Sequence, residues 1–268
     1  TSIHSLMILD MESKISFGGL WKDGPVPGQF YNFPNLGVES LHSKAGVSRS
    51  QAPVTTGTSV VGIVFDGGVC IAADTLGSYG SLARFRNCQR VMKVNNQTIL
   101  GAGGDYADFQ FLRSVIEQKV IDEDCFNDGF TLKPKSLHCW LTRVLYNRRS
   151  KFDPFWNFFV VGGLQDGEPF LGYVDKLGTA YEAKEIATGF GAYIAIPLLR
   201  EFRESNPNIT KADAKKLLVD CMRVLYYRDA RSFNKYEIVT VTAEGCELEG
   251  PLELDTNWEV AHMVKGYE

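Results

Sequence analysis

Long hydrophobic runs are absent from the sequence. The longest apolar stretches, such as residues 158–164, are far shorter than the roughly 20 residues that a membrane-spanning helix needs. Dense clusters of basic residues are absent too, and the formal net charge of the 268 residues is −4. Binding to nucleic acid or to an anionic membrane surface depends on such clusters, so we expect neither partner. The composition is that of a soluble globular protein.

Paired cysteines and metal-ligand motifs are also missing. The six cysteines are widely spaced without a CxxC pair, which in a chain of this size suits a reduced compartment. The four histidines are dispersed, and the adjacent His138-Cys139 lacks metal-ligand spacing. The glycine-rich run at residues 101–105 lacks the Lys-Ser/Thr pair of a phosphate loop, and we interpret it as a turn between a strand and a helix. No cofactor and no metal are therefore predicted.

The N-terminal region lacks a regular apolar pattern. Glycine and proline residues interrupt every short apolar stretch up to about residue 53, which predicts an extended leader. The first residues do not follow the order of a basic region, an apolar core and a small-residue cleavage site, so secretion is not expected.

Strand patterns begin at Thr58. The clearest pair is residues 59–65 and 69–73, which Asp66-Gly67-Gly68 joins as in a β-hairpin. Further strand pairs are predicted at residues 91–95 with 98–101, 157–164 with 169–174, and 236–242 with 246–249. Apolar residues at helical spacing predict helices near residues 109–120, 134–149, 192–202 and 210–225.

The order of these elements predicts the fold class. Strand pairs and helix pairs that are segregated along the chain favour an α+β domain over alternating βαβ units. Two antiparallel sheets, each covered on its outer face by a helix pair, form a four-layer αββα sandwich. Beyond Pro251 the chain carries Trp258, Val260 and Met263 but too few apolar residues for a core of its own. Exposed apolar residues in such a tail predict a surface for a partner.

A set of short motifs along the predicted domain carries a family resemblance. The motifs are Gly57-Thr58 before the first strand, Asp74-Thr75 after the second, residues 101–105, Gly189-Phe190-Gly191-Ala192 at a helix start, and Tyr227-Arg228-Asp229-Ala230-Arg231-Ser232 after a helix. With these motifs, and with the runs at residues 76–86, 104–110 and 225–232, the sequence resembles the proteasome β-subunit family over about residues 58–249. The resemblance implies the N-terminal nucleophile hydrolase fold, an αββα sandwich.

Active members of that family use an N-terminal threonine, whose hydroxyl attacks a peptide carbonyl while its free α-amine and a nearby lysine handle the proton. The resemblance places this nucleophile at Thr58 and the family's aspartate at Asp74. The lysine position holds Arg90, whose guanidinium stays protonated and cannot relay a proton, although it can pair with Asp74. The position of a helper serine holds Phe190.

Three other family positions are matched. Asp229 and Ser232 correspond to an aspartate and a serine near the nucleophile, and Gly104 corresponds to the residue whose N–H stabilises an oxyanion. Self-cleavage between Gly57 and Thr58 would use much of the same machinery. Its loss implies that Thr58 stays inside the chain without a free amine, so a catalytically silent subunit is expected.

The resemblance also divides the chain into parts. It implies a leader at residues 1–49, a short extension at 50–57, the β-subunit domain at 58–250 and a C-terminal tail at 251–268. A neighbouring active subunit is expected to cut the leader after Arg49, so that the mature chain begins at Ser50.

The expected function is structural support of a 20S proteasome core particle, which degrades proteins with or without ATP and ubiquitin. The implied roles are β-ring assembly and the pairing of half-particles. The implied partners are neighbouring β subunits of the β1 and β6 types, α-ring subunits, the opposite β ring through the tail, and assembly chaperones. The implied location is the cytoplasm and the nucleus.

Two alternatives belong to other functional classes. An active N-terminal-threonine endopeptidase would use Thr58 despite the arginine in the lysine position, and its mature chain would begin at Thr58. A free-standing binding module of the same fold would be monomeric in solution, whereas the faces of a ring subunit need partners.

Overall fold

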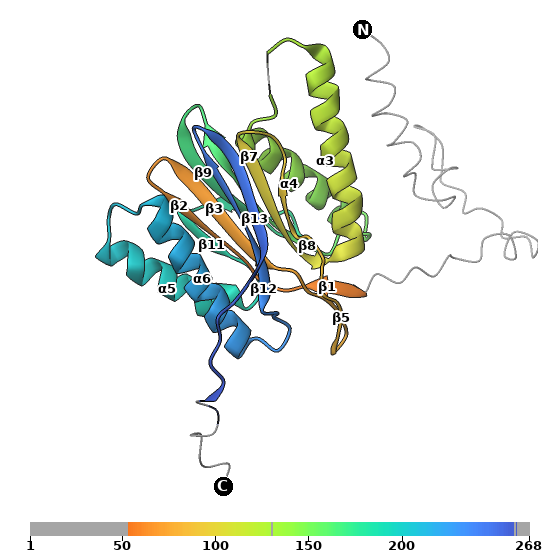
Figure 1. Ribbon diagram of the computed structural model, residues 1–268. Helices are drawn as coiled ribbons and strands as arrows, with labels where there is room; N and C mark the ends of the chain where they lie inside the picture. The colour runs from red at the N-terminus through yellow and green to blue at the C-terminus, as the bar shows by residue number, and fades with distance from the viewer. Residues whose placement is uncertain (1–52, 130, 260, 262–268) are drawn as a thin grey trace, which may run out of the picture. The chain divides into compact units, whose positions relative to one another are not determined.

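The computed structural model describes residues 53–129, 131–259 and 261. Within these residues two antiparallel sheets face one another, with one pair of helices on the outer face of each (Figure 1). The predicted four-layer αββα sandwich is thereby confirmed. None of the described helices is long and apolar enough to cross a membrane.

The larger sheet has eight strands and runs in the order β10-β9-β8-β7-β1-β4-β5, with β6 paired to β7 off this path. Two short strands pair with the same edge of its central strand β7. β6 pairs with the first part of β7, where Lys93 faces Ile99, and β1 pairs with the last part, where Gly57 faces Gly104. The strands are β1 (Thr55–Gly57), β4 (Gly77–Tyr79), β5 (Leu82–Phe85), β6 (Val91–Lys93), β7 (Thr98–Asp105), β8 (Asn157–Gln165), β9 (Glu168–Val174) and β10 (Ala180–Glu182).

The smaller sheet has five strands in the order β11-β2-β3-β12-β13. Its central strand β3 pairs along its full length with β12 on one side, and all but its last residue pairs with β2 on the other. Every residue of β3 is buried, as expected for a strand covered on both faces. The strands are β2 (Val60–Phe65), β3 (Gly68–Asp74), β11 (Glu185–Ala187), β12 (Lys235–Thr242) and β13 (Gly245–Glu253).

Four helices cover the sheets. α3 (Tyr106–Phe126) and α4 (Pro134–Ser150) pack on the larger sheet, and α5 (Gly191–Ser205) and α6 (Lys211–Arg228) pack on the smaller one. Asp105 caps α3 by accepting from the Asp108 amide, and Thr210 caps α6 by accepting from the Asp213 amide. The apolar spacing had predicted all four helices, and these two caps fix where α3 and α6 begin.

Three apolar layers hold the sandwich together. The layer between the sheets is built mainly from β-branched and leucine side chains, and the two outer layers lie between each sheet and its helices. The central layer includes Val60, Ile71, Ile99, Val160, Leu171 and Val239. Period-two alternation on both sheets supplies these residues.

The glycine-rich run at residues 101–105 was predicted as a turn, and this prediction is wrong. The run is the second half of strand β7, which continues to Asp105. Its glycines are needed because other chain segments lie against the strand. A Cβ on Gly101 would approach Val60 to 2.6 Å, and one on Gly103 would approach the Thr58 carbonyl oxygen to 2.9 Å.

Two predicted boundaries fall inside elements of the domain. The tail was placed from residue 251, but β13 continues to Glu253, and Leu254 is buried in the layer beneath α6. The extension at residues 50–57 includes β1, which belongs to the larger sheet. Thr55–Gly57 and the residues of β13 up to Glu253 therefore belong to the sheets, because each completes a ladder of backbone hydrogen bonds.

Candidate functional site

The residues assigned to family positions come together at one end of the sandwich. Thr58 lies between β1 and β2, and its hydroxyl donates to Asp229 Oδ2 at 2.5 Å across 171 residues of sequence. Asp229 follows α6 directly, and its Oδ1 accepts from the Arg231 amide at 2.9 Å. The Thr58 hydroxyl is therefore held by a carboxylate that a tight turn fixes in place.

Arg90 lies beneath Thr58 and is almost fully buried, with 2% of its surface exposed. Its Nε donates to the Asp74 carbonyl at 3.0 Å, and its Nη1 donates to the carbonyls of Thr58 at 2.9 Å and Ala102 at 3.1 Å. Its Nη2 donates to the Ser59 carbonyl at 3.0 Å and to the Asp74 carboxylate. A guanidinium has five N–H groups, so every donor of Arg90 is used.

The ion pair between Arg90 and Asp74 was predicted from the sequence, and it is present. The second carboxylate oxygen of Asp74 accepts from the Phe233 amide at 2.9 Å. Burial raises the pKa of the Asp74 carboxyl above its ordinary value, while the Arg90 charge and hydrogen bond oppose that rise. The pair therefore joins β3, the segment before β6 and the loop after α6.

Strand β1 fills the space between β4 and β7. Thr56 pairs with Ser78 on one side and with Asp105 on the other, and Gly57 pairs with Gly104. The Val54 amide also donates to the Asp105 carboxylate at 2.9 Å. Because the chain's own backbone already pairs with both flanking strands, an extended peptide has no free edge there on which to add.

Gly104 is held in a conformation that other residues rarely adopt. Its φ is +88°, and a Cβ would lie 1.9 Å from the Trp156 carbonyl oxygen. The neighbouring Asp105 amide donates to that same carbonyl at 2.8 Å. Gly104 pairs with Gly57, the residue that precedes Thr58; its assignment to the oxyanion position stays a prediction.

Phe190 lies at the start of α5 and is 56% exposed. It borders a pocket of about 260 Å³ that includes Thr58. The other residues that line this pocket are Pro53, Thr56, Gly57, Gly104, Trp156, Phe158, Thr188, Gly189 and Arg231. A ring in place of a serine hydroxyl removes a polar group from this pocket.

Among the described residues, Ser232 does not hydrogen-bond to Thr58 through its hydroxyl. Its amide donates to the Asp229 carbonyl at 3.1 Å, and its buried hydroxyl has no hydrogen-bond partner among the described residues. The structure therefore brings Thr58, Asp74, Arg90 and Asp229 into one network and leaves the Ser232 hydroxyl outside it.

Three polar residues that hold the site were missed in the sequence. Ser59 Oγ accepts from the Gly191 amide at 2.9 Å, and Thr188 Oγ1 accepts from the Val60 amide at 2.9 Å. Asn157 Nδ2 donates to the carbonyls of Gly103 at 3.1 Å and Asp105 at 2.8 Å. Each is a buried polar residue at or next to a strand end, and their partners lie more than 50 residues away, so local pattern gives no signal for them.

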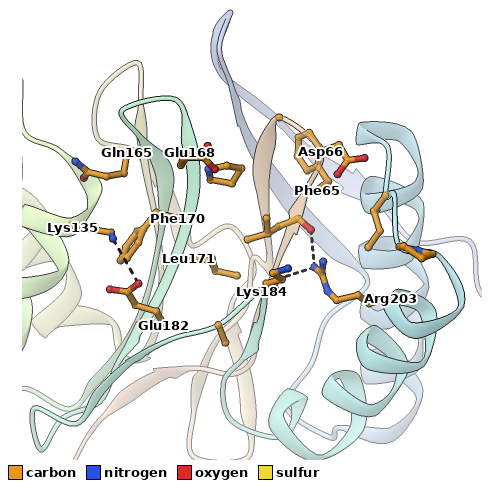
Figure 2. A pocket seen from close by; sticks show the side chains of 16 residues that line it. Phe65, Asp66, Lys135, Gln165, Glu168, Phe170, Leu171, Glu182, Lys184 and Arg203 are labelled. Carbon is orange, nitrogen blue, oxygen red and sulfur yellow. Dashed lines mark hydrogen bonds and ion pairs between the residues drawn. The ribbon is translucent and has the colours of Figure 1, made fainter.

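A larger pocket, of about 760 Å³, lies at the opposite end of β2 from Thr58 (Figure 2). Its floor includes Phe170 and Leu171. At its sides Lys135 lies 4.0 Å from Glu182, and Arg203 donates to the carbonyls of Val64 at 2.7 Å and Lys184 at 3.1 Å. None of the residues assigned to family positions lines it.

The predicted processing residues Arg49 and Ser50 lie outside the described residues, as do the leader at 1–49 and tail residues Val260 and Met263. Cleavage of the leader therefore stays a prediction.

Comparison with known proteins identifies the family. The family model described as Proteasome subunit matches residues 54–241. The chain is 59% identical over 245 residues to proteasome subunit beta type-4 of Xenopus laevis, covering 91% of this chain and 98% of that protein. It is 45% identical over 257 residues to the beta type-4 subunit of Drosophila melanogaster, covering 92% and 96%. The chain belongs to the proteasome subunit family.

Within that family the similarity extends to subunits with a second name. The chain is 40% identical over 238 residues to proteasome subunit beta type-7 of Saccharomyces cerevisiae, covering 84% of this chain and 90% of that protein. The predicted family and fold class are confirmed. Membership also means that other proteasome subunits are partners of this chain.

Proposed function

We propose that this chain is a non-catalytic β subunit of the 20S proteasome core, and that its function is architectural. The observation that carries the proposal is the environment of Arg90. All five of its N–H groups donate to acceptors around Thr58. A cation that is buried, paired and always protonated stabilises the fold but cannot accept the proton of a threonine hydroxyl.

The backbone around Thr58 supports the same proposal. Peptide-bond cleavage by a threonine of this family needs a free α-amine at that residue. Here the preceding residues form β1, which is paired on both sides. As long as β1 remains attached, Thr58 has no free amine and β1 occupies the space for a substrate strand, which supports a non-catalytic role.

The proposal extends to specific partners and to location. Neighbouring β subunits of the β1 and β6 types, the α ring, the opposite β ring and assembly chaperones are the proposed contacts. The proposed compartments are the cytoplasm and the nucleus, since reduced cysteines suit both.

An active endopeptidase is the competing function, and one contact is compatible with both functions. The hydrogen bond from the Thr58 hydroxyl to Asp229 would orient a nucleophile as well as a structural hydroxyl. The two functions differ in the first residue of the mature chain, because only a chain that begins at Thr58 has the necessary amine.

The decisive experiment is the intact mass and N-terminal sequence of this chain from purified native particles. We expect a start near Ser50, with Thr58 internal. A start at Thr58, together with labelling of that residue by a threonine-directed covalent inhibitor, would contradict the proposal.

A further inference from the structure

The hairpin formed by β4 and β5 exposes a concentration of apolar surface. Tyr79 is 50% exposed, Leu82 57% and Phe85 45%. All four residues of β5 are exposed, and Figure 1 shows β5 at the margin of the larger sheet, beyond β1. Large apolar side chains gathered on one short projecting element indicate a surface that a partner covers.

The charge of the hairpin is of one sign. Arg84 and Arg86 are exposed, and no Asp or Glu occurs between Asp74 and Asp105. Neither arginine forms an ion pair with any residue that the structure describes. The hairpin therefore presents guanidinium donors whose natural complement is a carboxylate.

The aromatic rings and Arg84 form one preorganised group. The Arg84 guanidinium lies 5.7 Å from the centre of the Tyr79 ring and 5.4 Å from that of Phe85. Cation–π contacts with two rings restrict the arginine before any partner binds. Restriction in the free state lowers the entropy lost on association.

The base of the hairpin is fixed to the sandwich. β4 pairs with β1, and the Cys88 amide donates to the Thr75 carbonyl at 2.8 Å. The Thr75 hydroxyl donates to the Arg86 carbonyl at 3.1 Å. Both ends of the hairpin are thus held to the sandwich, which fixes the position of its base.

We propose that the hairpin is a docking arm, and that it inserts its Leu82 and Phe85 side chains into an apolar groove bordered by carboxylates on a neighbouring proteasome subunit. Arg84 and Arg86 pair with those carboxylates. The partner is a protein, because two exposed arginines on a chain of net charge −4 are too few to hold a nucleic acid backbone. This inference rests on the proposed function, since it requires the chain to be part of the assembled particle.

The first test is photo-crosslinking in the native particle. In one variant a benzoylphenylalanine residue replaces Leu82. In a second variant, the matched control, it replaces Asp66, which is exposed in the turn at the far end of β2. We expect the probe at position 82 to capture a segment of another proteasome subunit that contains Asp or Glu, and the probe at 66 not to capture that segment. Capture of the same segment from both positions, or no capture of a subunit from position 82, would overturn the proposal.

The second test separates the charge of Arg84 from the shape of its guanidinium, and it measures incorporation of the chain into particles. Arg84→Glu should lower incorporation of the chain into particles about tenfold, because it places a carboxylate against carboxylates. Arg84→Lys keeps the charge but loses the planar stacking, so its loss should be smaller, about two- to threefold. Equal incorporation of wild type and Arg84→Glu would refute the docking arm alone. Absence of the wild-type chain from purified particles would instead refute the proposed function.

Discussion

Arg90 is the residue on which the site is built. The backbone carbonyls that it binds belong to four residues on three different segments, and each accepts a charge-assisted hydrogen bond. A lysine in this place has three N–H groups and cannot reach all of those acceptors. An arginine in place of the family's lysine therefore removes a proton acceptor from the site and at the same time stabilises the backbone around Thr58.

Replacing Arg90 should destabilise the chain strongly. Arg90→Met leaves the buried Asp74 carboxylate without its partner, and we expect the free energy of unfolding to fall by about 3–5 kcal/mol. Reduced incorporation and faster limited proteolysis of this chain would show the effect. The control is Arg113→Met, because the Arg113–Glu117 pair is exposed and contributes less than about 1 kcal/mol. Similar behaviour of both variants would contradict the assigned role of Arg90.

Thr58→Ala should leave every peptidase activity of the particle unchanged. The substitution removes the hydrogen bond to Asp229, which contributes about 1 kcal/mol to stability. Fluorogenic peptides for each activity of the particle provide the measurement, with Thr58→Ser as the control that keeps the hydroxyl. Loss of one activity in the alanine variant alone would mean that Thr58 is a nucleophile.

At the scale of elements, the segment after β13 is attached to the end of α6. Arg223 Nε donates to the Asp255 carbonyl at 2.9 Å, and the Asn257 amide donates to the Tyr227 hydroxyl at 2.6 Å. The Trp258 ring meets the Tyr227 ring edge to face, with 4.9 Å between centroids. These contacts fix the direction in which the chain leaves the domain.

Tyr227→Phe should loosen this segment without affecting the fold. The substitution removes one hydrogen bond that contributes about 1 kcal/mol, so the equilibrium constant for local opening of the segment should rise about fivefold. Amide exchange at Asn257 should accelerate by the same factor. Hydrogen exchange followed by mass spectrometry gives the measurement. The adjacent Tyr226→Phe is the matched control, because the Asn257 amide binds only the Tyr227 hydroxyl of this pair. Equal exchange in both variants would show that the hydroxyl does not hold the segment.

At the scale of the whole molecule, the tail is proposed to join two half-particles. Deletion of residues 255–268 should slow this pairing, so that half-size complexes accumulate on native gels. The deletion starts after Leu254 because that side chain is buried beneath α6, and its loss would damage the domain itself. The variant Leu254→Ala is the control for such damage. Normal assembly of the truncated chain would remove the proposed role of the tail.

Several parts of the fold could be predicted from the sequence. Long runs with a clear period identified the hairpin of β2 and β3, the pair β8 and β9, and all four described helices. The strands β1, β4, β10 and β11 have three residues each and β5 has four. Runs this short contain too few alternations to establish a period, so these five were missed, whereas the three-residue β6 was found because its partner β7 is long.

The sequence by itself determined the layered α+β class, the arginine in the lysine position and the aromatic residue at Phe190. The order and period of the predicted elements decide the class, whereas the family resemblance assigns Arg90 and Phe190 to their positions. Only the tertiary structure decided that β7 runs straight through its glycines, that β1 lies between β4 and β7, and that Arg90 uses every donor. These features join residues that are distant in sequence, and packing across the sandwich rather than local preference sets them.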